Sequence, residues 1–273
     1  MQVDYSKLDQ PEVLAALFHP REDTTSAPEG AIDVKIPVDG EVSLGGRFHL
    51  VADPGAVNIL FFHGNGEVVA DYDDVGPRYN AKDLNFLCVD YRGYGCSTGT
   101  PTVTNLLADS HLVLAWVKEW LANEEKTGPL VVMGRSLGCT TALELVAAAD
   151  PAIAGLIIES GFAFTVPLLE NMGLDPASLG ITEADGFRNQ HKICDFEKPV
   201  YILHAQHDQI ISIASAETLQ AQCKARAKEF AIIPGADHNN IIERVGDMYF
   251  SEIKRFIAKL GKPQRRSKPG VRG

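Results

Sequence analysis

The sequence predicts an α/β fold organised around a mostly parallel β-sheet. From Asn58 onward, short apolar runs of strand length alternate with longer stretches of helical periodicity, which is the pattern of successive βαβ units. Before Asn58, two runs of strand character are separated only by a short turn and therefore predict an antiparallel hairpin. With 273 residues and 45% hydrophobic content, the chain is long enough for one large domain, and no break in composition requires a second.

The expected elements rest on hydrophobic periodicity and on turn residues at their ends. A short helix over Pro11–Phe18 precedes the hairpin of Ala31–Pro37 and Glu41–Val51, which turns at Gly40. The buried strands are expected at Asn58–Phe62, Asn85–Asp90, Leu130–Met133, Gly155–Glu159, Val200–His204 and Glu229–Ile233. The helices are expected at Glu67–Tyr79, Val103–Asn123, Leu137–Ala149, Ala214–Gln222 and Ile241–Leu260. The last helix carries an apolar stripe that predicts packing on the sheet, formed by Ile241, Val245, Met248, Ile253, Phe256 and Leu260.

Composition excludes several classes of protein. The formal net charge of −11 disfavours nucleic-acid binding, because the field of the protein would repel phosphates. No apolar run approaches the length that spans a bilayer, and the polar segment Met1–Gln10 does not have the pattern of a signal peptide. Five cysteines without a repeated spacing argue against a disulfide framework, so we expect a reducing, cytoplasmic setting.

A long segment without clear alternation separates the strand that ends at Glu159 from the strand that begins at Val200. Segments of this length inside an α/β domain usually form a lid or a binding loop, so we expect a lid at about 161–196. Residues 1–261 are expected to form a single domain, and the basic residues 262–273 a disordered tail. The lid residues expected to bind substrate are Phe162, Phe164, Leu168 and Met172.

The sequence Gly134-Arg135-Ser136-Leu137-Gly138 has the pattern of a nucleophile elbow. It follows the apolar strand Leu130–Met133 and precedes a helical run, which is the context that this motif requires. A sharp turn between strand and helix pushes the side chain of Ser136 outward, and the flanking glycines allow the helix to pack closely. We therefore expect Ser136 to be the nucleophile.

A serine hydroxyl needs a base, and the base needs an orienting acid. We expect the base to be His238, which lies in a turn-rich loop after the last strand. His204 and His207 compete for this role but lie earlier in the chain than expected. Four further histidines lie in segments with no tie to the site: His19, His49, His111 and His191.

The preferred acid is Asp208, because its loop follows the strand Val200–His204 and can reach His238. Glu159, at the end of the preceding strand, remains the alternative. Asp237 adjoins His238 in sequence, so its side chain is poorly directed toward that imidazole.

Two backbone N–H groups are expected to hold the oxyanion that forms on the substrate. One belongs to Leu137, directly after the nucleophile. The other is placed at Asn65, in the glycine-rich loop His63–Glu67 that follows the strand Asn58–Phe62. His63 is expected to be a structural hydrogen-bonding residue of that loop.

These motifs together resemble the α/β-hydrolase superfamily over about Ala31 to Leu260. The matching segments are His-Gly-Asn-Gly at 63–66, Asp-Tyr-Arg-Gly-Tyr-Gly-x-Ser at 90–97, Gly-Arg-Ser-Leu-Gly at 134–138, and the loops of Asp208 and His238. The second segment is similar to the branch of serine-aminopeptidase-like hydrolases and the acyl-protein-thioesterase-like enzymes close to them. The resemblance implies an eight-stranded, mostly parallel sheet with helices on both faces and a serine hydrolase mechanism. Tyr91, Arg92 and Tyr94 are expected to brace the loops around the site.

The leading hypothesis is a serine hydrolase that cleaves a small-molecule carboxylic ester or thioester through an acyl-enzyme. A second hypothesis is a peptidase that recognises a free N-terminal amine through lid carboxylates, and a third is a non-catalytic ligand-binding protein of the same fold. The lid carboxylates available to a peptidase are Glu170, Asp175, Glu183 and Asp185. No cofactor is expected, and the scattered His and Cys residues predict no metal site. The acyl group, the leaving group and the oligomeric state stay open.

Overall fold

The computed structural model describes residues 4–260, whose strands form one eight-stranded sheet in the order β1-β2-β4-β3-β5-β6-β7-β8. Strand β2 is antiparallel to β1 and β4, and the other neighbouring pairs are parallel. The expected mostly parallel sheet is confirmed. The strands are β1 (Ala31–Asp39), β2 (Val42–His49), β3 (Val57–Phe62), β4 (Leu84–Val89), β5 (Leu130–Arg135), β6 (Ile153–Glu159), β7 (Val200–Ala205) and β8 (Lys228–Ile233).

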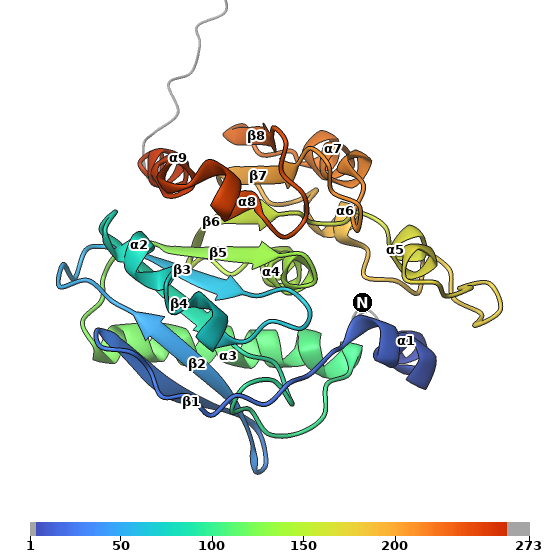
Figure 1. The fold of residues 1–273 in the computed structure, drawn as a ribbon, viewed down its shortest axis with the longest axis horizontal. Coiled ribbons are helices and arrows are strands. Elements are labelled where there is room, and N and C mark those ends of the chain that lie inside the picture. The colour runs from blue at the N-terminus through green and yellow to red at the C-terminus, as the bar shows by residue number, and fades with distance from the viewer. Residues whose placement is uncertain (1–3, 261–273) are drawn as a thin grey trace, which may run out of the picture.

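Helices cover both faces of the sheet (Figure 1). One face packs against α3 (Val103–Asn123), α4 (Gly138–Ala147) and α7 (Ile213–Gln222), and α1 (Pro11–Leu17) joins the core on this side from beyond the ends of the strands. The other face packs against α2 (Gly76–Asn80), α8 (Ile241–Val245) and α9 (Asp247–Ile257). Shorter elements are the 3₁₀ turns η1 (Ser6–Asp9) and η2 (Val69–Tyr72) and the helices α5 (Thr165–Asn171) and α6 (Asn189–Lys192).

Strand β5 shows why the central strands read as continuous apolar runs. Leu130 and Val132 point into the core on the α3 and α4 side, whereas Val131 and Met133 point into the core on the α2 and α9 side. Because successive strand residues face opposite sides, a strand covered on both faces needs apolar residues at every position. This packing fixes β5 at the centre of the molecule and places its carboxyl end beside the loops of its neighbours.

The helix expected at Glu67–Tyr79 is wrong as one element. The structure instead has η2, a short connection, and then α2, which begins at Gly76 with Pro77 in its first turn. Proline lacks a backbone N–H and its ring clashes with the preceding turn, so a helix can start at Pro77 but cannot run through it.

The single helix expected at Ile241–Leu260 is also wrong. Gly246 has a φ of +63° and separates α8 from α9. The break changes the phase of the apolar stripe, so Met248 is 64% exposed while Tyr249 and Phe250 are buried. The expected contact of Met248 with the sheet is therefore corrected, whereas Ile253 and Phe256 lie in the core as expected.

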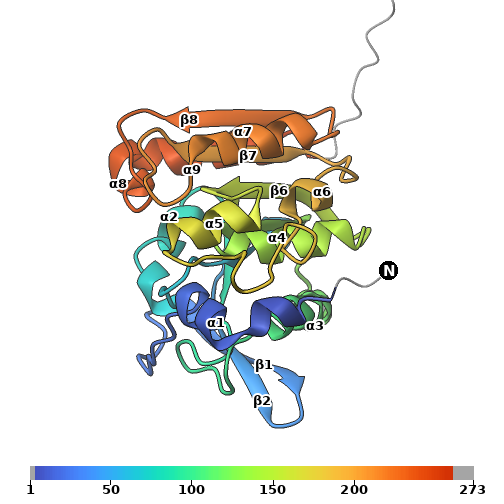
Figure 2. The same ribbon diagram turned by 90° about the vertical axis from the view of Figure 1, so that its right-hand side faces the viewer.

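The carboxyl ends of the parallel strands lie on one side of the molecule, beneath α1 and the segment that carries α5 (Figures 1 and 2). This segment, residues 161–196, is called the lid segment below, and its role as a lid stays a prediction. Phe162 and Phe187 in it are fully buried, with their ring centroids 5.5 Å apart. The expected basic tail, 262–273, lies outside the described residues. Across residues 4–260, every helix is too short or too polar to traverse a lipid bilayer.

Glu144 of α4 connects the N-terminal segment, α3 and the end of the lid segment. Its Oε2 atom accepts a hydrogen bond from the Tyr5 hydroxyl at 3.2 Å and lies 2.7 Å from Nζ of Lys192, and its Oε1 atom lies 3.6 Å from Nε2 of His111. Burial opposes the ionisation of this carboxyl group, but His111 and Lys192 outweigh burial and lower the pKa of Glu144 to about 2.

Ionised Glu144 should therefore stabilise the fold at neutral pH. Because its folded-state pKa lies below its usual value of 4.5, this stabilisation is present above pH 4.5 and is lost as the pH falls toward 2. Glu144→Gln should lower the thermal midpoint at pH 6 by roughly 3–6 °C, and the difference from wild type should shrink below pH 4.5. Thermal unfolding followed by circular dichroism from pH 6 to pH 3 measures this. A difference that stays constant over this range would contradict the assignment.

Candidate active site

Ser136 stands at a sharp turn between β5 and α4, with a φ of +52°. The turn is tight because two glycines let the surrounding backbone approach closely. A Cβ atom on residue 138 would lie 2.0 Å from the carbonyl oxygen of Phe62, and one on residue 134 would lie 2.3 Å from that of Gly138. No larger residue fits at either position, so the local sequence holds Ser136 in a conformation that serine rarely adopts.

The structure brings Ser136, His238 and Asp208 into one hydrogen-bonded row. Nδ1 of His238 lies 2.7 Å from Oδ2 of Asp208, and Nε2 lies 3.0 Å from Oγ of Ser136. Since a carboxylate only accepts, Nδ1 carries the proton, and Nε2 is free to accept a hydrogen bond from the serine hydroxyl. This is the arrangement in which an imidazole can remove the hydroxyl proton.

The carboxylate of Asp208 is fully buried and held from two sides. Its Oδ1 atom accepts hydrogen bonds from the backbone N–H groups of Ile210 and Ile211, at 3.0 and 2.8 Å. Burial favours the neutral acid, but the contacts with His238 and Ile211 outweigh it and lower the pKa of Asp208. Asp208 is therefore ionised at neutral pH and fixes the imidazole in one orientation.

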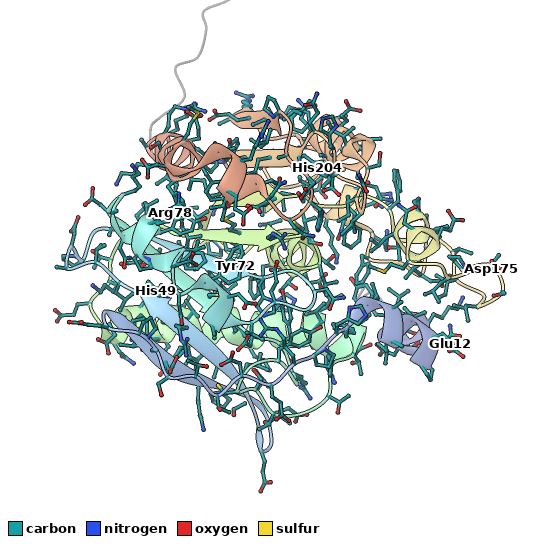
Figure 3. All side chains as sticks on the ribbon, in the orientation of Figure 1. Glu12, His49, Tyr72, Arg78, Asp175 and His204 are labelled. Atoms are coloured by element: carbon teal, nitrogen blue, oxygen red, sulfur yellow. The ribbon has the colours of Figure 1, made fainter. Side chains whose placement is uncertain are left out.

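His204, near the end of β7 (Figure 3), forms contacts that hold the Asp208 loop in place. Its Nε2 atom donates a hydrogen bond to the carbonyl oxygen of Ile211 at 2.8 Å and lies 3.5 Å from Oδ2 of Asp208. Burial lowers the pKa of His204, so the ring is neutral. The competing base candidate thus contacts the acid and not the serine.

Glu159, the alternative acid, makes other contacts. Its carboxylate accepts a hydrogen bond from the Tyr249 hydroxyl and lies 3.3 Å from Nε of Arg135. Burial raises its pKa, and Arg135 and Tyr249 oppose that shift. Among the described residues, Asp208 and not Glu159 forms a hydrogen bond with His238.

The loop after β3 lies beside the serine, and its role as the source of an oxyanion donor stays a prediction. Asn65, Ser136 and Leu137 line the same hollow. Leu137 stands at the start of α4, where backbone N–H groups lack partners within the helix and the helix dipole favours negative charge. His63 is buried, with Nε2 3.2 Å from Oδ1 of Asp90, which is consistent with a structural hydrogen-bonding role.

The N-terminal segment packs directly on this loop. The backbone N–H of His19 donates to Oδ1 of Asn65 at 2.8 Å, and Nδ2 of Asn65 donates to Nδ1 of His19 at 2.9 Å. Nε of Arg21 donates to the carbonyl oxygen of Gly66 at 3.0 Å. The interpretation of His19 as unconnected to the site is therefore wrong. Nothing in the sequence indicates that this segment packs on the loop after β3.

The hollow next to Ser136 is apolar and small, with a volume of about 20 Å³. A neighbouring hollow of about 40 Å³ shares four of its lining residues and reaches Phe164. The expected substrate-binding residues all line one or both hollows, and they are Phe162, Phe164, Leu168 and Met172. Sequence reasoning missed Leu17, Ile210 and Ile211, which line the hollow from α1 and from the Asp208 loop. The one sequence signal for Ile210 and Ile211 is that they lie two and three residues after Asp208.

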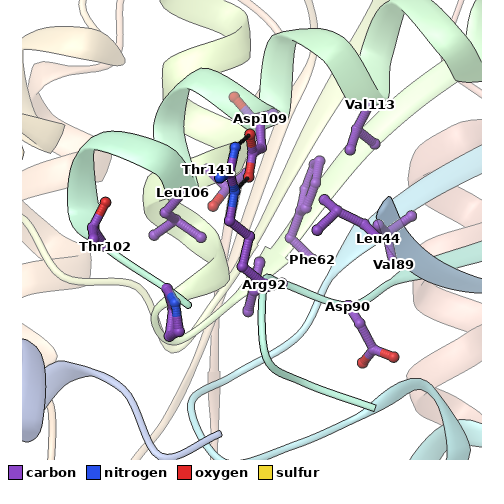
Figure 4. Close-up of a pocket in the computed structure, with 13 residues that line it drawn as sticks. Leu44, Phe62, Val89, Asp90, Arg92, Thr102, Leu106, Asp109, Val113 and Thr141 are labelled. Atoms are coloured by element: carbon purple, nitrogen blue, oxygen red, sulfur yellow. Dashed lines mark hydrogen bonds and ion pairs between the residues drawn. The ribbon is translucent and has the colours of Figure 1, made fainter. Parts of the chain in front are cut away.

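The three residues expected to brace the loops do not all do so. The hydroxyl of Tyr91 donates to the carbonyl oxygen of His63 at 2.6 Å, and that of Tyr94 donates to Oδ1 of Asn65 at 2.8 Å. Arg92 instead forms a two-point ion pair with Asp109 of α3, at 2.7 and 2.8 Å (Figure 4). The cavity beside this pair has a volume of about 10 Å³, which is room for about one water molecule and not for a ligand.

The comparisons with known proteins agree with this architecture. The family model described as serine aminopeptidase, S33 matches residues 54–172. The chain is 30% identical over 207 residues to protein bem46 of Schizosaccharomyces pombe, a match that covers 74% of this chain and 67% of that protein. It is also 30% identical over 210 residues to alpha/beta hydrolase domain-containing protein 17B of Homo sapiens, covering 74% and 66%. The chain thus spans about two thirds of the length of these curated relatives.

Solved structures share the fold at lower identity. The Pyrococcus furiosus esterase Pf2001 superposes with a TM-score of 0.71 at 19% identity, covering 89% of this chain and 99% of that one. A soluble variant of monoglyceride lipase from Saccharomyces cerevisiae superposes with a TM-score of 0.64 at 20% identity, covering 88% and 98%. Together with the sheet order and the strand–serine–helix turn, these matches show that the chain belongs to the α/β-hydrolase superfamily, in the serine aminopeptidase S33 family.

Proposed function

We propose that the protein is a serine hydrolase that cleaves a carboxylic ester or thioester through an acyl-enzyme intermediate. The observation that carries this proposal is the row of hydrogen bonds from Asp208 through His238 to Ser136. Such a row activates a hydroxyl group that is otherwise a weak nucleophile at neutral pH. The family assignment and the similarity in fold to an esterase and a monoglyceride lipase also support it.

In the proposed first step, Oγ of Ser136 attacks the substrate carbonyl carbon while its proton passes to Nε2 of His238. The carbonyl oxygen becomes an oxyanion that accepts hydrogen bonds from the backbone N–H groups of Asn65 and Leu137. Asp208 stabilises the imidazolium that forms and keeps it oriented. The tetrahedral intermediate then collapses, and the alcohol or thiol leaves with the proton of the imidazolium.

The second step repeats this chemistry with water. Nε2 of His238 takes a proton from a water molecule, whose oxygen attacks the acyl carbon bound to Ser136. Collapse of this second intermediate breaks the bond to Oγ, and the imidazolium returns the proton to the serine. The products are the free acid and the resting enzyme.

The lining of the hollow beside Ser136 supports an apolar acyl group as the part of the substrate held there. Apart from Asn65 and Ser136, its walls are the side chains of Leu17, Leu137, Phe162, Leu168, Met172, Ile210 and Ile211. The small volume favours short acyl groups in the conformation described. Burial of each further CH₂ group of an acyl chain would contribute about 0.8 kcal/mol where the walls have room for it.

The peptidase alternative is less well supported, because most of the lid carboxylates already have structural partners. Glu183 accepts hydrogen bonds from the N–H groups of Thr165 and Val166 at the start of α5. Asp185 pairs with Lys7 at 2.9 Å. Asp175 closes a local turn at the outer end of the lid segment (Figure 3).

The proposed setting is a reducing, cytoplasmic compartment. It is supported by the five cysteines, all within the described residues, none of which forms a disulfide.

Replacing Ser136 with alanine should abolish turnover. We expect p-nitrophenyl acetate hydrolysis to fall at least 10⁴-fold, because the acyl acceptor is lost. Wild type should also be labelled by a fluorophosphonate probe, and Ser136→Ala should not. Parallel assays with aminoacyl arylamides should show much slower turnover than with esters. Equal ester rates in the two proteins would eliminate the proposal, and an unlabelled, inactive wild type would favour a ligand-binding protein.

Replacing the two candidate acids should separate them. Asp208→Asn should reduce kcat by about 10⁴-fold, because an amide cannot stabilise the imidazolium or hold the same tautomer. Glu159→Gln, which keeps the shape of a buried side chain with the same neighbours, should reduce kcat by less than about tenfold. Steady-state kinetics on folded variants decides between them. The reverse order of effects would show that Glu159 is the acid.

Widening the hollow should change the preference for acyl length. Met172 is only partly buried, so Met172→Ala should enlarge the hollow without a large loss of stability. We expect the ratio of kcat/KM for p-nitrophenyl hexanoate to that for acetate to rise about five- to tenfold, as one or two CH₂ groups gain a place. Met248→Ala, at an exposed position in α9, is the matched control and should leave the ratio unchanged. An unchanged ratio in Met172→Ala would show that the acyl group lies elsewhere.

A further inference from the structure

Arg135, the last residue of β5, makes contacts that reach three loops around Ser136. Its side chain is only 12% exposed. Nη1 forms an ion pair with Glu67 in the loop after β3, and Nε lies 3.3 Å from Oε1 of Glu159 at the end of β6. Nη2 donates to the backbone carbonyl of His238 at 2.8 Å and to the side-chain oxygen of Asn239 at 3.1 Å.

On one side, these contacts fix the loop that carries the proposed oxyanion donor Asn65. The second oxygen of Glu67 accepts hydrogen bonds from the N–H of Gly64 at 2.6 Å and from the hydroxyl of Tyr72 at 2.7 Å. A Cβ atom on residue 64 would lie 2.7 Å from Nη1, so the loop backbone rests directly on the guanidinium group. A shift of this group would therefore move the loop.

On the other side, the contacts fix the loop that carries the imidazole. Ring position depends on the backbone of His238, and Arg135 holds the carbonyl oxygen of that residue directly. The guanidinium group is planar and presents its donors at fixed angles, so it sets the distance and orientation of both loops at once. It also stands at the end of β5, a central strand that is hydrogen-bonded on both sides and therefore gives the residue a rigid support.

We propose that Arg135 is a positioning residue that holds the Asn65 amide and the His238 ring in register with Ser136. This inference rests on the proposed function. Arg135 stays charged although it is buried: burial opposes the charge, but the carboxylates of Glu67 and Glu159 outweigh burial and raise the pKa of Arg135 above its usual value. Arg135 touches neither Ser136 Oγ nor the ring nitrogens of His238 in hydrogen bonds, so it acts through the loops.

A cavity of about 420 Å³ leads to the guanidinium group from the α2 side of the sheet. Tyr72 and Arg78, both labelled in Figure 3, line it together with Glu159 and His238. The cavity is separate from the apolar hollow at Ser136, so a small cation can approach the position of Arg135 without entering the acyl site. This makes chemical rescue by guanidinium ions a direct test.

The experiment compares ester hydrolysis by wild type, Arg135→Ala and Arg135→Lys. We expect Arg135→Ala to lower kcat about a hundredfold with little change in KM, because misplaced donors weaken transition-state contacts more than substrate binding. Arg135→Lys keeps the charge but cannot make the forked contacts, so its kcat should fall about tenfold at a nearly unchanged thermal midpoint. Guanidinium ions, at concentrations far below those that denature the protein, should raise the kcat of Arg135→Ala at least fivefold over its value without them.

Arg92→Ala is the matched control. Arg92 is 11% exposed and pairs with a buried carboxylate, Asp109 (Figure 4). Its ion pairs are with Asp109 and Asp39, neither of which belongs to the three loops. Arg92→Ala should lower the thermal midpoint but leave the kcat of the folded protein within about twofold of wild type, and guanidinium ions should not raise it. If Arg135→Ala does not fold, Arg135→Lys carries the test alone.

The outcomes separate the inference from the proposed function. An inactive wild type that a fluorophosphonate does not label would remove the proposed function itself. With an active wild type, folded Arg135 variants that keep kcat within twofold would overturn the positioning role. The same would follow if Arg135→Ala and Arg92→Ala lost equal shares of activity, or if guanidinium ions raised both equally.

Discussion

The contact between α4 and the end of β3 is the constraint on which the rest of the site depends. The helix comes so close to the carbonyl oxygen of Phe62 that only glycine fits at position 138. This approach forces Ser136 into its left-handed conformation and aims the start of α4 at the space above the strands. The loop that begins at His63 follows directly from the end of β3. Its backbone amides therefore lie close to Ser136.

Charged side chains are distributed unequally between the two sides of the sheet next to Ser136. The proposed acyl side is apolar, whereas the opposite side of the sheet holds Arg135 between the buried Glu159 and the partly exposed Glu67. Burying such charges is costly unless each is paired. The ion pairs of Arg135 with Glu67 and Glu159 connect loops that no helix or strand joins. They therefore add rigidity around Ser136 that the sheet alone does not provide.

Much of the fold could be predicted from sequence because its signals are local. The strand–serine–helix pattern needs only the residues around Ser136, and the buried strands identify themselves by continuous apolar runs. The hydrogen-bonded partners of Ser136 could be anticipated from the order of loops along a parallel sheet, and the structure brings His238 and Asp208 to that serine. Their chemical roles stay predictions.

What could not be predicted depends on contacts between distant segments. Arg135 occupies the variable position of its motif, and nothing in the sequence pairs it with Glu67 or His238. The helix expected through Pro77 and the one expected through Gly246 are wrong, because a single residue that changes the backbone geometry interrupts a helix even where the hydrophobic periodicity continues. The choice between Asp208 and Glu159 required knowing that Tyr249 and Arg135 occupy the second carboxylate.

The clasp that His19 and Arg21 form on Asn65 and Gly66 has a consequence for how the chain can be altered. The segment that precedes β1 therefore holds the Asn65 loop from outside the sheet. Trimming the chain to begin at β1 would leave the sheet complete yet remove that clasp. Such a shortened protein would also lose the buried side chains of Leu8, Val13 and Leu17, so the hydrophobic core and the position of the Asn65 loop would be weakened together.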